Sequence, residues 1–239
     1  HGNHYGHYKH HWFQKHDLRN KKKLQTQYFY DSFGNLNKVI LPNNDVIEYV
    51  IDGQNRRVGK KLNGKLLQML VYQSQTQIAA ELDGQGNLIR RYVYGSKINV
   101  PDYFIQKGVK YKIISDHLGS PRLIVNASSG KIIDEMSFDE FGILEKDHDL
   151  RDHDNIGIPF GFAGGLYDEH TGLVRFGARD YDPTVGRWTS KDPVGFESSE
   201  INLYVYALLN PINFIDQDGE EAISIGVGLV SGILSDLIL

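Results

Sequence analysis

A short word built around one aspartate returns along this chain and restricts its fold more than any other feature. Each copy follows an apolar or aromatic stretch, runs through Asp with Gly or Asn a few residues later, and leads into another such stretch. The copies lie in residues 28–36, 49–57, 81–95 and 136–143. Two alternating stretches joined by a tight turn indicate a β-hairpin. A return roughly every twenty residues indicates a repeat architecture.

The residues of the word have a physical reason to lie in turns. Asp and Asn tolerate left-handed backbone and bond to nearby amides, whereas Gly adopts positive φ at little cost. The 14 tyrosines fit a pleated surface, because the ring packs across strands while the hydroxyl reaches a partner. We therefore predict an all-β chain whose hairpins, over residues 24–145, form part of a spiralling antiparallel sheet.

Composition excludes several classes of function. The 26 basic and 30 acidic side chains give a formal charge of -4, so no global field attracts nucleic acid. The short basic runs Lys21–Lys23 and Lys60–Lys61 have no accompanying aromatic platform and indicate solvated loops. The absence of cysteine excludes disulfides, thiolate metal sites and cysteine catalysis. We expect no nucleic-acid partner and no cofactor.

Two polar segments contain potential metal ligands. Residues 1–23 are rich in histidine and residues 146–156 combine histidine with aspartate, and such side chains can ligate divalent cations. Histidine-rich ends are usually disordered, and charged runs are usually solvated connections. We expect a disordered lead, a surface loop and no metal site.

A serine, a histidine and an aspartate also lie close together in residues 116–120. Asp116, His117 and Ser120 are too near in sequence for the oriented contacts of a catalytic triad, and no strand-to-helix elbow surrounds the serine. The sequence therefore disfavours a hydrolase of this type.

The densest signal lies between Gly161 and Gly219, where Gly, Asp and Tyr recur at fixed offsets. Several words in one order are far more specific than an isolated motif. The words are Gly165-Leu166-Tyr167-Asp168, Arg179-Asp180-Tyr181-Asp182-Pro183, Gly186-Arg187-Trp188, Asp192-Pro193-Val194-Gly195, Asn202-Leu203-Tyr204-Val205-Tyr206 and Asn210-Pro211-Ile212-Asn213.

These words resemble the core-associated domain that ends the repeat array of Rhs and YD-repeat proteins. The Asp-His-Leu-Gly-Ser word at residues 116–120 is similar to the entry to that core. The resemblance implies a β-shell of the kind found in teneurins and in the C component of insecticidal toxin complexes. Within it, residues 24–145 are expected to form wall hairpins and residues 157–219 the plug that closes the shell.

The resemblance also implies a function. Such a shell encloses a C-terminal cargo, keeps it inactive and releases it at a target cell. The implied partners are the cargo itself, upstream YD repeats, and a target-cell surface or secretion apparatus. The implied location is secreted or on the cell surface, with a bacterial origin. Since the chain begins with His1 and shows no signal peptide, we expect a piece of a longer protein.

Many Rhs and toxin-complex proteins cut themselves after the core with two aspartates. The matching residues are Asp192 and Asp216, and Arg187 is placed to set their charge balance. Two close carboxylates cannot both ionise easily, so one retains a proton while the other activates water. The resemblance thus implies catalytic roles for this pair in intramolecular cleavage near Gly219–Glu220.

Two departures from the family pattern put this cleavage in doubt. Cutting members close with Asp-Pro-X-Gly-Leu and are severed after the leucine, whereas this chain has Gln217 for the proline and Glu220 for the leucine. A glutamate there adds a third carboxylate and disturbs proton sharing. Aspartate before Pro or Gly is also ordinary turn chemistry.

Residues 220–239 form an apolar tail that marks the start of a variable C-terminal region. Its apolar run is borderline for a membrane span, which needs about 20 residues. A short helix that packs or enters a membrane, and a buried or fraying segment, both remain open.

Three functions are therefore weighed. The first is an encapsulating shell for a polymorphic toxin or secreted delivery protein. The second is a cell-surface adhesion module of the teneurin type. The third is a self-cleaving aspartic peptidase whose cut frees the cargo.

Overall fold

An eleven-stranded antiparallel sheet forms most of the protein in the computed structural model, which describes residues 25–145, 157–193, 195 and 202–224. Every strand pairs with its neighbours in sequence, so the sheet is a continuous meander. We call β1–β11 the repeat sheet. Its strands are β1 (Gln27–Tyr30), β2 (Leu36–Ile40), β3 (Val46–Ile51), β4 (Arg57–Leu62), β5 (Lys65–Tyr72), β6 (Ile78–Asp83), β7 (Leu88–Val93), β8 (Tyr103–Gln106), β9 (Val109–Ser115), β10 (Pro121–Asn126) and β11 (Ile132–Glu135).

One turn geometry recurs through the sheet and explains the repeated word. In the copy at Asp83, the carboxylate Oδ1 accepts hydrogen bonds from the backbone N–H of Gln85 and Asn87, both at 2.9 Å. The backbone N–H of Gly86 donates to the carbonyl of Asp83, and Gly86 has a φ of 88°. The side chain thus replaces two missing strand partners, and the glycine supplies a left-handed backbone.

The same carboxylate pattern appears at five aspartates. They are Asp31, Asp52, Asp83, Asp116 and Asp139. Asn55 takes the left-handed position in the second copy, with a φ of 61°, because asparagine is the side chain that best tolerates this region. The copy at Asp116 corresponds to the word that resembles the core entry, so this word is a further hairpin turn.

Alternation along the strands gives the repeat sheet one buried face. Leu36, Val39, Ile47 and Tyr49 on β2 and β3 form one apolar cluster. Farther along, residues of β5–β11, including Tyr92 and Phe104, form a second cluster. A period of two in side-chain direction places these residues on the same side of the sheet.

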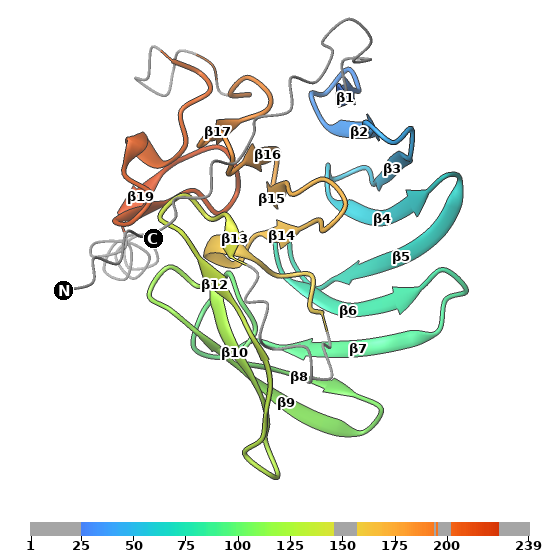
Figure 1. Ribbon diagram of the computed structural model, residues 1–239, viewed down its shortest axis with the longest axis vertical. Helices are drawn as coiled ribbons and strands as arrows, with labels where there is room; N and C mark the ends of the chain where they lie inside the picture. Colours follow the sequence, from blue (N-terminus) through green and yellow to red (C-terminus); the bar gives the residue numbers. More distant parts are fainter. Residues whose placement is uncertain (1–24, 146–156, 194, 196–201, 225–239) are drawn as a thin grey trace, which may run out of the picture.

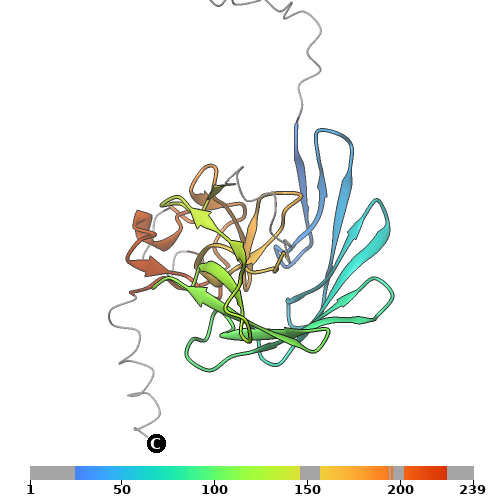
Figure 2. The same cartoon turned by 60° about the horizontal axis from the view of Figure 1, so that its bottom comes forward.

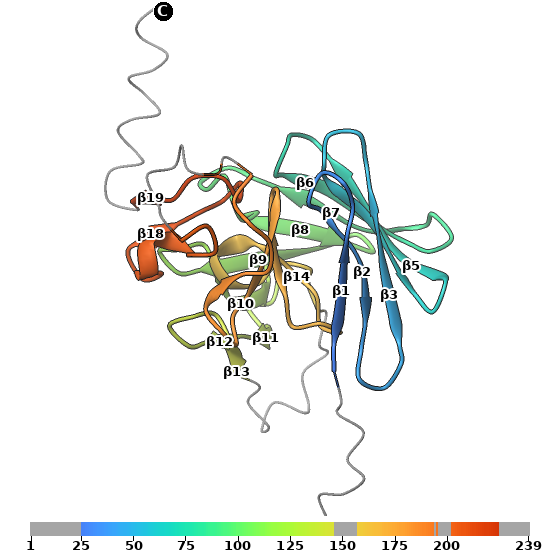
Figure 3. The same ribbon diagram turned by 90° about the horizontal axis from the view of Figure 1, so that it is seen from above.

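The rest of the described chain forms the C-terminal region, residues 157–193, 195 and 202–224. Its strands are short: β14 (Leu166–Tyr167), β15 (Val174–Phe176), β16 (Arg179–Asp182) and β17 (Arg187–Trp188) form one sheet, and β18 (Phe214–Ile215) pairs with β19 (Ile223–Ser224). Two single 3₁₀ turns, η2 (Phe162–Gly164) and η4 (Ala207–Leu209), complete it. Figures 1 and 2 show the repeat sheet curving around this region, and Figure 3 shows the same arrangement from above.

The fourth predicted hairpin forms but leaves the repeat sheet. β12 (Ser137–Phe138) and β13 (Leu144–Glu145) pair only with each other. Packing explains the departure, because the buried Phe138 belongs to the aromatic core of the C-terminal region and lies 6.5 Å from Phe162, centroid to centroid. The wall of hairpins predicted for residues 24–145 therefore ends as one sheet at Glu135.

The fold class predicted from the sequence is confirmed, since all regular pairing is antiparallel β. Within the described ranges no helix has the length and apolar character needed to span a bilayer. The helix considered for the tail involves residues 225–239, which lie outside the described residues. The predicted disordered lead and polar loop also lie outside them.

Candidate functional site

Buried charges join the repeat sheet to the C-terminal region. Asp180 of β16 forms ion pairs with Arg57 of β4 at 2.7 Å and with Arg175 of β15 at 2.9 Å. All three side chains are buried. Arg175 Nη2 also donates to the Asn35 side chain of the first repeat turn at 2.7 Å. A buried charge is costly unless paired, so this network fixes the position of the C-terminal region against the sheet.

A second buried carboxylate, Asp168, makes similar contacts. Lys60 Nζ donates to its Oδ1 and the Tyr49 hydroxyl to its Oδ2, both at 2.7 Å. Burial acts to raise the pKa of Asp168, but hydrogen bonding from His170 together with Lys60 outweighs it and holds the pKa well below the ordinary range. The carboxylate is therefore ionised at neutral pH.

Polar side chains fix the far end of the sheet as well. The backbone N–H of Ala163 donates to the Ser120 hydroxyl, and the Ala163 carbonyl accepts from the Asn99 amide at 2.8 Å. Ser120 therefore serves as an anchor for η2. Asp116 instead pairs with Arg122, and His117 lies 3.1 Å from the Ile212 carbonyl. The three side chains considered as a triad thus have separate partners.

The two aspartates of the predicted carboxylate pair meet at one arginine. Arg179, the first residue of β16, forms an ion pair with Asp192 at 2.9 Å and another with Asp216 at 3.0 Å. Its Nε donates to the carbonyl of Gly219 at 2.6 Å. The guanidinium also lies over the Trp188 ring, 4.2 Å from its centroid. One buried cation thus contacts both carboxylates and the backbone at the expected cleavage position.

Asp216 has the electrostatics of a proton donor. Burial raises its pKa to about 7, Arg179 opposes this, and the neighbouring Asp218 raises the pKa further. Its Oδ1 accepts from the backbone N–H of Gly219 at 2.8 Å and of Glu220 at 3.1 Å. Near neutral pH this carboxyl is therefore partly protonated beside the nitrogen of the Gly219–Glu220 peptide bond.

Close backbone packing holds this segment in place. The N–H of Ala178 donates to the Asp218 carbonyl at 2.7 Å. A Cβ added to Gly177, which has a φ of 40°, would lie 2.0 Å from the same carbonyl oxygen. Any larger residue would push the β15–β16 turn away from residues 216–219, because main-chain atoms cannot move aside as a flexible side chain does.

Sequence analysis named Arg187 as the supporting cation and missed Arg179. Arg187 is exposed in β17, and the arginine that contacts both aspartates lies in the Arg-Asp-Tyr-Asp word. Glu220 is also exposed, and the carboxylate that acts on Asp216 is Asp218. Only pairing across the fold selects Arg179 among the arginines of this region. Catalytic roles for Asp192, Asp216 and Arg187 stay predictions.

Nothing in the geometry of the described residues adds a metal centre. No group of three or more His, Asp or Glu side chains there is arranged to hold an ion. The histidine-rich lead and the polar loop considered as ligand sources lie outside these residues.

A repeat sheet built from aspartate turns and folded around a core-associated region defines the class of YD-repeat shell proteins. The family model described as teneurin YD-shell matches residues 4–212. The chain belongs to the teneurin YD-shell family, which confirms the resemblance stated from the sequence.

Relatives from animals and bacteria match most of the chain. Teneurin-3 of Danio rerio is 30% identical over 193 residues, covering 77% of this chain and 7% of that protein. The tRNA3(Ser)-specific nuclease WapA of Bacillus spizizenii is 28% identical over 200 residues, covering 80% of this chain and 8% of that protein. The chain thus spans less than a tenth of either relative, and the predicted bacterial origin stays a prediction.

A solved toxin-complex structure has the same fold. The crystal structure of TcdB2-TccC3-TEV matches with a TM-score of 0.61 and 22% identity, covering 81% of this chain and 10% of that one. At this identity the match concerns the fold alone.

Proposed function

We propose that this chain is the closing part of a YD-repeat shell that encloses and delivers a C-terminal cargo. In this proposal the repeat sheet is wall, residues 157–219 are the plug, and residues 220–239 lead into the cargo. Further YD repeats preceding this chain would extend the wall from the free edge of β1. The protein would act outside the cell or at its surface.

The buried network around Asp180 carries the proposal. It joins the first repeat turns to a region more than a hundred residues later in the sequence, as in the Arg57–Asp180 hydrogen bond, which spans 123 residues. Such pairing makes the region an integral closure of the curved sheet and not an appended domain. The relative named a nuclease supports a separate cargo, since only 8% of that protein matches this chain.

Protease protection tests the shell. The protein that contains this chain would be digested lightly, and the survival of its C-terminal continuation followed by mass spectrometry. We expect protection in the wild type and early digestion in the Asp180→Asn variant, with Asp182→Asn as the matched control on the same strand. Equal digestion of the continuation in all three proteins would contradict encapsulation and favour the alternative of a surface adhesion module.

We propose intramolecular aspartic cleavage as a second activity, favoured by the contacts of Arg179. Arg179 would polarise the Gly219 carbonyl, and Asp192 would take a proton from a water that adds to the carbonyl carbon. Asp216 would give its proton to the Glu220 nitrogen as the C–N bond breaks. The products would be a Gly219 carboxylate and a new amino terminus at Glu220.

Intact mass tests this cleavage. An expressed chain extended past Leu239 would be compared with its Asp192→Asn and Asp216→Asn variants. We expect a cut in the wild type and none in either variant. A cut after Glu220, as the resemblance implies, differs in mass by one glutamate residue and is thus distinguished from a cut after Gly219. An uncut wild-type chain would overturn the proposal.

The pH dependence gives an independent check. The general acid must carry its proton, and the pKa of Asp216 is raised to about 7. Cleavage should therefore proceed below pH 7 and slow about tenfold per unit above it, as measured by the time course of the cut at several pH values. A rate that rises with pH through this range would exclude Asp216 as the acid.

A further inference from the structure

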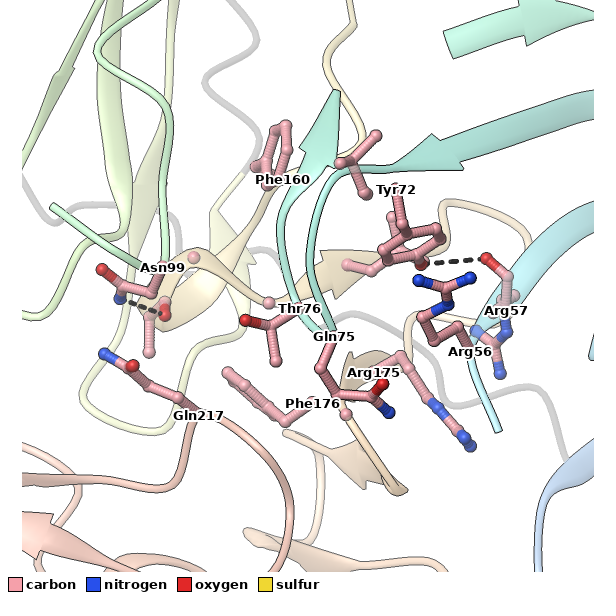
Figure 4. A pocket seen from close by; sticks show the side chains of 16 residues that line it. Arg56, Arg57, Tyr72, Gln75, Thr76, Asn99, Phe160, Arg175, Phe176 and Gln217 are labelled. Atoms are coloured by element: carbon pink, nitrogen blue, oxygen red, sulfur yellow. Dashed lines mark hydrogen bonds between the residues drawn. The ribbon is translucent and has the colours of Figure 1, made fainter. Parts of the chain in front are cut away.

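A small cavity lies between the repeat sheet and the C-terminal region, apart from the carboxylate pair. Its volume is about 50 Å³. Figure 4 shows the loop that carries Gln75 and Thr76 at its centre, with Asn99 and Gln217 on one side and Arg56, Arg57 and Arg175 on the other. One water needs about 10–15 Å³ of such space, so the cavity has room for a small ion.

Two arginines that line the cavity are incompletely paired. Arg57 and Arg175 are each 4% exposed. The Nε atoms of both are buried and have no hydrogen-bond partner among the described residues. Buried guanidinium nitrogens nearly always have a partner, because an unmet donor costs about 1–3 kcal/mol or more for a charged group. Two such atoms on adjacent side chains indicate a shared acceptor.

The charges around the cavity leave one positive charge in excess. Arg57 and Arg175 share the single carboxylate of Asp180, and Lys60 is matched by Asp168. At the mouth, Arg56 is matched by Asp52 at 2.7 Å.

The two like charges also act on each other. Burial lowers the pKa of Arg175, and the charge of Arg57 acts in the same direction, against the opposing effect of Asp180. A monovalent anion in the cavity would neutralise the excess and accept from the free nitrogens.

We propose that this cavity is a binding site for a small monovalent anion of the size of chloride, held by the Nε groups of Arg57 and Arg175. Its position gives it a role in assembly. The anion would bridge β4 of the repeat sheet and β15 of the C-terminal region, and so add to the closure that Asp180 alone leaves one charge short. The site is independent of the carboxylate pair and of cleavage.

Bromide tests the site directly. Crystals of the full 239-residue chain would be soaked in sodium bromide, and the anomalous difference map calculated. We expect a peak within hydrogen-bond distance of both Nε atoms. A map with bromide elsewhere and none in this cavity, or with a water at the site that bromide does not replace, would overturn the proposal.

A solution measurement uses a matched pair of variants on one loop. Gln75 lines the cavity, whereas Gln77 lies two residues further on and does not. Gln75→Glu places a carboxylate at the mouth that repels or replaces the anion, and Gln77→Glu changes the net charge equally.

The melting temperature of each protein would be followed as chloride replaces gluconate at constant ionic strength. We expect a saturable rise in the wild type and in Gln77→Glu, and none in Gln75→Glu. Equal responses of all three proteins would mean a general salt effect and contradict the site.

Discussion

The repeat sheet and the C-terminal region solve the problem of stability in opposite ways. The sheet reuses one turn and pairs each strand with its sequence neighbour, so its contacts are local. The C-terminal region has strands of two to four residues and depends on an aromatic core, buried ion pairs and contacts far along the chain. Its core combines Phe162, Phe176, Tyr181, Trp188 and Tyr206.

This difference shows how a repetitive wall acquires a defined shape. A meander can add or lose hairpins with little change in each unit, so the repeats alone do not determine the curvature. Here the curvature is fixed by side chains that reach from separate turns to one region, such as Asn35 and Arg57 to the β15–β16 hairpin. The wall supplies the surface, and the buried charges determine how far it closes.

Removing the shared carboxylate should break this division of roles most severely. The Asp180→Asn substitution leaves Arg57 and Arg175 buried without a counter-charge, and breaking a buried pair costs about 3–5 kcal/mol. We expect a loss of this size in the free energy of unfolding from chemical denaturation. Asp182→Asn, two residues on and in a turn, is the control and should cost at most about 1 kcal/mol. Similar losses for both would mean that the network is not special.

Acid should weaken the closure before it weakens the wall. The pKa of Asp168 is lowered in the folded state, so its contribution to stability is present above the ordinary value of 3.8 and is lost as the pH falls below it. We expect Asp168→Asn to cost about 2 kcal/mol at pH 7 and progressively less below pH 4, measured by denaturation at several pH values.

Asp83→Asn provides the comparison within the wall. The pKa of Asp83 is also lowered, through hydrogen bonds from Asn87 in an exposed turn. The sign of its pH dependence is therefore the same, and we expect a smaller effect. A larger loss for Asp83→Asn than for Asp168→Asn would reverse the assignment of roles to the two regions.

The smallest expected effect concerns the turn itself. Gly86 has a positive φ, and an added Cβ would lie no closer than 3.8 Å to the Met69 side chain, so its backbone conformation alone decides the cost. Gly86→Val should cost about 1–2 kcal/mol and Gly86→Asn less than about 1 kcal/mol, because asparagine visits this region more readily. Thermal denaturation of both variants checks this. Equal costs would show that space and not backbone conformation restricts the position.

The wall could be predicted from the sequence because its turns depend on local chemistry. The aspartate, the left-handed glycine or asparagine and the flanking alternation all lie within a few residues, as at Asp31 and Asp83. The copy at Asp116 was not recognised as a repeat turn, since its His-Leu-Gly-Ser residues differ from the other copies. The departure of β12 and β13 from the sheet could not be predicted, because it depends on packing of Phe138 against a distant phenylalanine.

The candidate site was only partly predictable for the same reason. Asp192 and Asp216 stand out through their turn motifs, but nothing local distinguishes Arg179 from Arg175 or Arg187. Pairing in space selects it, through one guanidinium that contacts both aspartates and a backbone carbonyl. The cavity between Arg57 and Arg175 also arises from residues that are separated by more than a hundred positions.

The long separation between the repeat turns and Asp180 has a consequence for biosynthesis. A ribosome makes the wall first, at about 5–20 residues per second, and its inner face with Tyr49 and Arg57 then has nothing to cover it. The residues that cover it are made last, and contacts of such high sequence separation form slowly. The nascent sheet must therefore wait with an uncovered apolar and cationic face, so this is the stage at which chaperone capture or misassembly would be decided.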